Sequence, residues 1–251
     1  MWNKVVGVIK TKGIVIASAN SSDNDKVLTI LTPDLGKISA FYKGAKKSKT
    51  ASLNSSEYLS FSDLVLYKSP NDNYSINNAE TIEVFFNLRV DIDKLNYATA
   101  ISKMVYDVTE ENIPSYDILQ LFLNTLYVIS ETDKNLDLVF SVFQIRLLAI
   151  LGFLPQIDRC INCDEPMVEE MEEFYFSIKD DGVKCKTCQK LDKSIIRLSK
   201  ASFSAIVYAL SCDAKKLYSF ELPQDDIDEL KVFTKLYTTQ KLDKEYNVIK
   251  M

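Results

Sequence analysis

Four of the chain's five cysteines form two C-x-x-C pairs, Cys160 with Cys163 and Cys185 with Cys188. Each pair can place two thiolates on one tight turn, and two such turns make a tetrahedral shell of sulfurs, which suits zinc. Between the pairs lie the apolar stretch "FYFSI" and the turn sequence "KDDG", so the segment can form a hairpin that joins them. Because four protein ligands leave no open coordination position, the spacing predicts one structural Zn²⁺ per chain.

Other uses of these thiols fit the sequence less well. A thioredoxin-like redox site needs a single C-x-x-C in a βαβ setting, and a zinc deaminase needs H/C-x-E and P-C-x-x-C motifs. Four thiolates could also hold an iron–sulfur cluster, but zinc is the commoner occupant of this paired spacing. The fifth cysteine, Cys212, falls in a helical pattern and is expected to be a small buried hydrophobe.

The composition excludes several classes of enzyme. The chain has no histidine, which removes Ser-His-Asp and Cys-His catalysis, H-E-x-x-H metalloproteases and His-ligated catalytic zinc. An apolar fraction of 47% with 26% charged residues is ordinary for a globular protein. The start "MWNKVVGVIK" has no signal-peptide h-region, and "LLAILGFLP" is too short to span a bilayer, so we expect a cytoplasmic protein with reduced thiols.

The hydrophobic pattern changes from strand to helix near residue 88. Before it, short alternating or β-branched runs are separated by Gly13, "PDLG", Gly44 and "PNDN", which predicts a small antiparallel barrel. The runs at 5–10 and 13–18 are predicted as separate strands, divided at Gly13. After it, apolar residues recur with a period of 3.6, which predicts a helical core. The predicted helices cover residues 98–108, 118–129, 136–150, 200–211 and 225–242.

Lysines gather in one acid-free segment of the predicted barrel. Residues 1–80 carry ten lysines against seven acidic residues, whereas residues 81–251 carry twenty basic residues against twenty-eight acidic ones. Phe41 and Tyr42 face opposite sides of the strand beside this segment, so only one of them can be exposed to stack on a base. The segment is a candidate for phosphate contacts, and a solvated turn is the alternative. Its lysines are Lys37, Lys43, Lys46, Lys47 and Lys49.

Three stretches resemble the RecO family of bacterial recombination and DNA-repair mediators. "GIVIASANSSDNDKVLTILTPDLGKISAFYKGAKKSK" is similar to the family's opening, with its "SDK"-like turn, "GK" and basic loop. "FQIRLLAILGFLPQIDRCINC" resembles the family's helix that ends in Leu-Gly and runs into the first zinc knuckle. "FSIKDDGVKCKTC" resembles the hairpin into the second knuckle, so the likeness extends over nearly the whole chain.

This resemblance implies an α+β protein with an N-terminal OB-fold β-barrel and a helical C-terminal domain into which a four-cysteine zinc ribbon is inserted. The implied division is 1–80 for the OB-fold, 81–157 and 193–251 for the helical domain, and 158–192 for the zinc ribbon. It also implies binding of single- and double-stranded DNA, annealing of complementary strands, and loading of RecA with RecR. The substrate would be DNA coated by single-stranded DNA-binding protein, and no enzymatic activity is expected.

Arg146 is the candidate partner-binding residue. It lies in the mostly apolar segment "FQIRLLAILG", where its simplest role is that of a solvent-facing or snorkelling side chain. The resemblance implies that this helical region receives the acidic, hydrophobic tail of single-stranded DNA-binding protein, and an arginine suits a carboxylate there.

Two other classes of function remain open from the sequence. One is a zinc-ribbon scaffold that binds RNA or protein in transcription or translation. The other is a hydrolase that uses a pair of carboxylates, although no spacing singles out such a pair. The acid-rich stretch "DEPMVEEMEE" is better explained as a solvated face of the zinc hairpin.

Overall fold

The computed structural model describes residues 7–45, 54–168, 171–192 and 194–249. The chain divides into two compact units, residues 1–130 and 131–251. The finer division at residues 80, 157 and 192 stays a prediction. None of the helices in the described part of the chain combines the length and the apolar character that a bilayer crossing needs.

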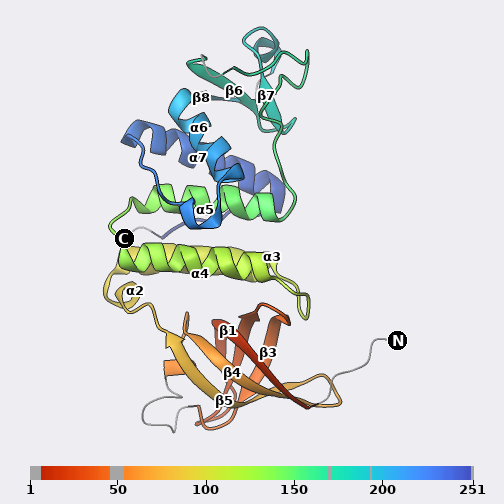
Figure 1. Ribbon diagram of the computed structural model, residues 1–251, viewed down its shortest axis with the longest axis vertical. Coiled ribbons are helices and arrows are strands. Elements are labelled where there is room, and N and C mark those ends of the chain that lie inside the picture. The colour runs from red at the N-terminus through yellow and green to blue at the C-terminus, as the bar shows by residue number, and fades with distance from the viewer. Residues whose placement is uncertain (1–6, 46–53, 169–170, 193, 250–251) are drawn as a thin grey trace. The chain divides into compact units, whose positions relative to one another are not determined.

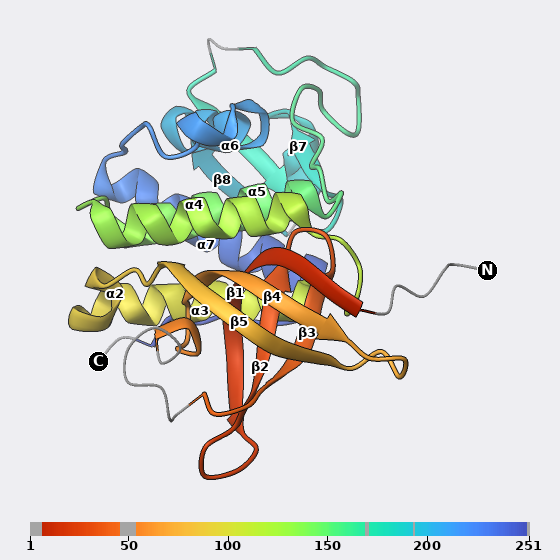
Figure 2. The ribbon, with the colours of Figure 1, turned by 60° about the horizontal axis from the view of Figure 1, so that its bottom comes forward.

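The first unit begins with a closed five-stranded barrel (Figures 1 and 2). Neighbouring strands follow the order β1-β2-β3-β5-β4, with β1 pairing β4 to close the ring, and the β3–β5 pair is parallel while the others are antiparallel. This is the strand order of an OB-fold, so the predicted barrel is confirmed. The strands are β1 (Gly7–Asn20), β2 (Lys26–Thr32), β3 (Gly36–Tyr42), β4 (Phe61–Lys68) and β5 (Tyr74–Glu83).

Strand β1 does not break at Gly13, so the prediction of two separate strands there is wrong. The first half of β1 pairs with β4 and the second half with β2, and the strand passes from one neighbour to the other at Ile14. A Cβ at Gly13 would lie 2.5 Å from Cγ2 of Ile30. The glycine therefore lets a continuous strand bend closely over the barrel interior instead of ending it.

The connection from helix α3 (Ile92–Val108) to helix α4 (Tyr116–Glu131) adds a short extra segment to the barrel. The backbone N–H of Lys37 donates to the carbonyl of Glu110, and that of Asn112 donates back to the carbonyl of Lys37. The hydroxyl of Tyr74 on β5 reaches the side-chain oxygen of Asn112 at 3.2 Å. Because β3 pairs with β5 only at its far end, this segment supplies partners for the beginning of β3.

Three helices complete the first unit. They are α2 (Asn87–Val90), α3 (Ile92–Val108) and α4 (Tyr116–Glu131). Asp91 caps α3, since its carboxylate accepts from the backbone N–H groups of Asp93 and Lys94. The apolar face predicted for α4 is buried along its whole length, from Ile118 to Ile129, which confirms that stripe as core.

The second unit combines three helices with a small antiparallel sheet of order β7-β6-β8. Helix α5 is buried on almost every side, which explains its nearly continuous apolar sequence. Gly152 follows α5 with a φ of +88°, as expected of a residue that ends a helix. The helices are α5 (Leu136–Ile150), α6 (Lys200–Ser211) and α7 (Gln224–Leu242), and the strands are β6 (Glu173–Ser177), β7 (Gly182–Lys184) and β8 (Ile195–Ser199).

Aromatic side chains pack this sheet on the helices. The ring of Phe174 stacks on that of Phe203 in α6, with centroids 3.8 Å apart. Phe176 meets Phe233 of α7 edge-on at 4.9 Å. The predicted hairpin between the two cysteine pairs is present as β6 and β7, while β8 is a third strand that the sequence pattern did not predict.

Candidate metal centre and nucleic-acid interface

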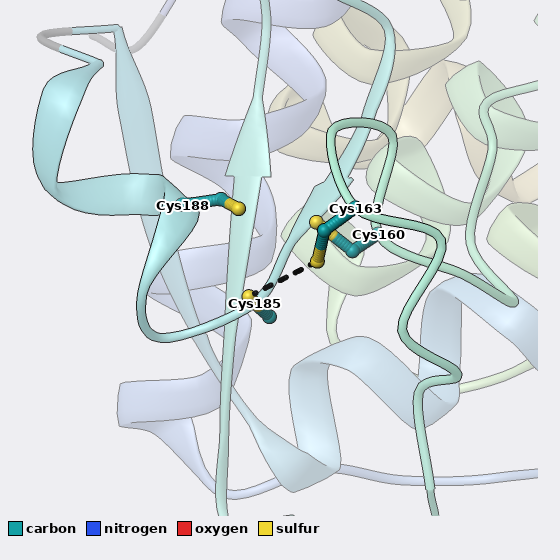
Figure 3. A group of neighbouring side chains, drawn as sticks. All are labelled: Cys160, Cys163, Cys185 and Cys188. Atoms are coloured by element: carbon teal, nitrogen blue, oxygen red, sulfur yellow. Dashed lines mark hydrogen bonds between the residues drawn. The ribbon is translucent and has the colours of Figure 1, made fainter.

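The four paired cysteines meet at one point in the second unit (Figure 3). Their sulfur atoms all lie within 4.8 Å of one another, and those of Cys163 and Cys185 are 3.7 Å apart. A tetrahedral zinc with Zn–S bonds of about 2.3 Å separates its sulfurs by about 3.8 Å, whereas a disulfide needs about 2.05 Å. Four soft donors at this spacing fit a tetrahedral metal ion, so the cluster can hold one.

The first knuckle is shaped by its own backbone. The N–H of Cys160 donates to the carbonyl of Glu165, and the N–H of Asp164 donates to the carbonyl of Cys160. Asp164 has a φ of +62°, which reverses the chain after Cys163. The N–H of Ile161 donates to the carbonyl of Val183 on β7 at 3.0 Å. The sheet that leads into the second knuckle therefore also fixes the first.

The turn between β6 and β7 brings the second knuckle beside the first. Asp181 occupies the left-handed region, with a φ of +60°. A Cβ on the next residue, Gly182, would lie 2.5 Å from Cγ2 of Ile161 and 3.0 Å from the Gln156 carbonyl. The glycine of "KDDG" is therefore required by the close approach of two segments.

A buried lysine joins the two ends of the second knuckle. Lys184, directly before Cys185, has a side chain only 7% exposed. Its Nζ lies 2.6 Å from a carboxylate oxygen of Asp180 and 2.7 Å from one of Asp192. Ser177 on β6 donates to the same Asp192 oxygen at 2.6 Å. We call Lys184, Asp180 and Asp192 the knuckle clamp, because it joins the chain before and after the second cysteine pair.

The surroundings of Cys160 favour its thiolate, whereas those of Cys188 oppose ionisation. Burial alone would raise the pKa of Cys160, but backbone hydrogen bonds from Cys185, Asn162 and Cys163 lower this pKa to about 6. Hydrogen bonds with the thiols of Cys163 and Cys185 raise the pKa of Cys188 to about 12. A divalent cation bound by the cluster would offset this rise in pKa, because it stabilises every thiolate around it.

The predicted lysines of the barrel have different surroundings. Lys37 is engaged inside the first unit, since its Nζ donates to the carbonyl of Tyr106 at 2.6 Å and lies 4.2 Å from the centre of that ring. Lys43 is exposed just after β3, where the N–H of Gly44 is held by a carboxylate oxygen of Asp25 at 2.7 Å. The other three, Lys46, Lys47 and Lys49, lie outside the described residues.

The two aromatic residues of β3 divide as predicted. Phe41 is 37% exposed and Tyr42 is 7% exposed, so Phe41 is the one on the outer surface. A second outward aromatic, not predicted from the sequence, is Tyr67 on β4, which is 40% exposed. Along β4, Tyr67 follows the buried Leu66 and falls on the same face as the exposed Asp63. This period-two alternation could have predicted an outward Tyr67 from the sequence.

Arg146 is half-buried on α5 and is not simply solvent-facing. Its Nη2 donates to the carbonyl oxygen of Cys212 at 2.5 Å and lies 3.2 Å from the Cys212 sulfur. Its Nε is buried without a hydrogen-bond partner among the described residues. Cys212 is itself half-buried at the end of α6, so the prediction that it is a buried hydrophobe is wrong.

Two family profiles match consecutive parts of the chain. Residues 6–85 match "Recombination protein O N terminal", and residues 89–248 match "Recombination protein O C terminal". A "DNA repair protein RecO" from Acetivibrio thermocellus is 36% identical over 238 residues, which cover 95% of this chain and 93% of that protein. Similar proteins of the same description come from Caldicellulosiruptor bescii, 30% identical over 96% of each chain, and Alkaliphilus metalliredigens, 29% identical over 94% and 95%.

Proposed function

Because the chain belongs to the RecO family of DNA repair proteins, we propose that it binds DNA, anneals complementary single strands and acts as a recombination mediator. With RecR, it would help to load RecA recombinase onto DNA coated by single-stranded DNA-binding protein. The observation that carries the proposal is the match of both family profiles to a chain whose barrel bears an acid-free run of lysines. Such work on DNA would take place in the cytoplasm.

The lysine segment is the proposed cationic contact to DNA phosphates. Lys43 stands exposed at its start, and Lys46, Lys47 and Lys49 continue it. Because Lys37 is occupied by Tyr106, we expect it to contribute mainly to the position of β3 and less to DNA. Local charge governs such contacts more than net charge does, so the overall value of −5 is compatible with DNA binding.

Zn²⁺ is the proposed occupant of the four-cysteine cluster, one ion per chain. It would be held by Cys160, Cys163, Cys185 and Cys188, and its contribution would be to stabilise the ribbon. The chain's own residues prepare this site, because backbone N–H groups favour the Cys160 thiolate and the knuckle clamp holds the chain around Cys185. No catalytic role is proposed for the metal or for any other residue.

An acidic, hydrophobic tail of single-stranded DNA-binding protein is the proposed partner of the second unit. An apolar groove of about 640 Å³ runs between α6 and the chain near the first knuckle, lined by Phe174, Phe203 and Val207 among others. Ser211 also lines the groove, and the next residue, Cys212, contacts Arg146. A tail could therefore place apolar side chains in the groove and a carboxylate near the guanidinium.

An annealing assay tests the proposed function. Complementary oligonucleotides, one carrying a donor dye and the other an acceptor, are mixed with the protein in the absence of ATP. We expect annealing to be faster with the protein than without it, both on bare strands and on strands coated with single-stranded DNA-binding protein. Equal annealing rates with and without the protein, together with no DNA binding, would contradict the proposal.

A further inference from the structure

The strand register lines up one row of outward side chains across the barrel. Tyr67 pairs with Val8 on one side and with Ser75 on the other, while Phe41 pairs with Ser75 and with Val27. Paired residues of neighbouring strands point to the same face of a sheet, so these side chains form a continuous band. We call this band the outer girdle; its members are Val8, Tyr67, Ser75, Phe41 and Val27.

The girdle presents two separated rings to the outside. Phe41 and Tyr67 flank Ser75, so their strands are two positions apart, or about 10 Å at the usual spacing of strands. Ser75, between the two rings, has a small side chain and is half-exposed. Leu66 and Ala40, the chain neighbours of these aromatics, are fully buried, which shows that the rings point away from the barrel core.

Two lysines lie on one side of the girdle. No member of the girdle is charged. Lys10 is the next outward residue after Val8 on β1, and Lys43 lies two residues after Phe41, in the turn that follows β3; both are exposed. The strand directions place both lysines on the same side of the girdle. Asp25 lies on that side as well, two residues before Val27 and beside Lys43, where its carboxylate accepts from the backbone N–H of Gly44 at 2.7 Å. Asp63 lies one outward position farther away than Lys10.

This arrangement matches the two edges of a single nucleic-acid strand. Unpaired bases have free faces that stack on aromatic rings, and phosphates follow along one side of them. In a duplex those faces are already covered, so a surface with outward rings is suited to single strands. We propose that the girdle is a base-stacking platform for single-stranded nucleic acid, with one base on Phe41, one on Tyr67, and phosphates beside Lys10 and Lys43.

This inference rests on the proposed function and names the aromatic residues of its DNA site. A protein partner would also cover exposed valines and aromatics. However, two exposed lysines on one side of the girdle, with a small polar residue between the two rings, fit a strand of alternating charge and base better than they fit an apolar protein face.

The test combines two changes: a substitution that removes a ring from the protein, and an oligonucleotide that lacks the bases. The full chain is titrated with oligothymidylate and with an abasic oligonucleotide of the same length, which keeps the phosphates and lacks the bases. Phe41→Ala and Tyr67→Ala should each weaken oligothymidylate binding about fivefold or more, because stacking on a ring is lost. Both variants should bind the abasic strand as the wild type does, and the dependence of affinity on salt should not change.

Controls separate stacking from folding and from general loss of surface. Tyr67→Phe and Phe41→Tyr keep the rings and should keep the affinity. Tyr127→Ala removes another exposed aromatic of the same unit, on α4, and should have no effect on DNA binding. Thermal melting of every variant checks that the barrel remains folded.

Two results would overturn the inference. One is salt-dependent DNA binding by the wild type that neither alanine variant weakens; the proposed function would then stand and the girdle would not be its stacking site. The other is a girdle that joins two copies of the chain, seen as self-association in sedimentation that Tyr67→Ala abolishes while DNA affinity is retained. A wild type that binds no DNA at all would instead contradict the proposed function itself.

Discussion

Gly36 and Ile113 are in such close contact that a Cβ on the glycine would lie 1.9 Å from the carbonyl oxygen of Ile113. The glycine also has a φ of +64°, in the left-handed region that side chains disfavour. This contact is where the connection between α3 and α4 rests on the start of β3. The position of β3, which carries Phe41 and leads to the lysine segment, therefore depends on it.

Gly36→Ala should destabilise the first unit by about 2 kcal/mol or more, since the new methyl group meets a backbone atom in a strained conformation. Urea unfolding followed by circular dichroism measures the loss. Gly44→Ala is the matched control, because Gly44 has a φ of +68° but, its chain neighbours apart, no atom of the described residues lies within 4 Å of its Cβ position. We expect Gly44→Ala to lower the free energy of unfolding by only about 1 kcal/mol. Equal losses in the two variants would argue against the contact.

Metal analysis should find one zinc per chain, because four thiolates complete one tetrahedral shell. Cys160→Ser or Cys185→Ser should release zinc and lower the soluble yield while the barrel retains its strand signal. Cys212→Ser removes the cysteine outside the cluster and should keep the zinc content unchanged. Iron in the purified protein, or a well-folded chain with four free thiols and no metal, would contradict the zinc assignment.

The sequence predicted the parts of this protein that depend on local pattern. Period-two runs indicated the barrel, and the spacing of the cysteines predicted that Cys160 and Cys188 would meet, as they do. The prediction that the strand breaks at Gly13 was wrong because glycine has two uses in strands. It can end a strand, or it can let a strand bend over a neighbour such as Ile30, and the chain alone does not distinguish them.

Features that depend on distant pairing were not predictable in the same way. The row from Phe41 through Ser75 to Tyr67 exists because of the barrel register, which joins residues far apart in the chain. Likewise, nothing in the sequence near Lys184 indicates that its charge is buried between two carboxylates. A lysine in a charged segment is usually solvated, and only the fold of the hairpin shows otherwise.

Lys184→Met should destabilise the second unit by about 2 kcal/mol or more, since it leaves Asp180 and Asp192 close together without their cation. The partial exposure of Asp180 moderates the effect. Zinc should also be lost more easily to a competing chelator, because the clamp holds the chain around Cys185. Lys184→Met combined with Asp180→Asn and Asp192→Asn removes the repulsion and should recover part of the stability. No change in either stability or chelator competition would show that the clamp is dispensable.

Acid should weaken the clamp. The Lys184 ammonium, helped by Ser177 and Ser194, holds the pKa of Asp192 well below its usual range. A carboxyl whose folded pKa is depressed contributes stability above its unfolded pKa of about 4, and that contribution falls as the pH drops toward the folded value. The difference in unfolding free energy between wild type and Asp192→Asn should therefore be largest above about pH 5 and shrink toward pH 3. Loss of zinc in acid affects both proteins, so a difference that stays constant with pH would contradict this account.

DNA binding should depend on the lysine segment through charge. Lys46→Ala combined with Lys47→Ala should weaken binding to all single-strand sequences alike and make the salt dependence shallower, by about 0.7 in the logarithmic slope for each phosphate that is no longer neutralised. Annealing should slow in parallel, while zinc content and thermal stability stay unchanged, because a lysine that serves to contact phosphates is not expected to stabilise the fold. Lys215→Ala with Lys216→Ala, an exposed pair in the second unit, is the matched control and should leave the slope unaltered. If the affinity curves of wild type and Lys46/Lys47 variant superimpose across the salt series, the segment is a solvated loop and DNA binds elsewhere.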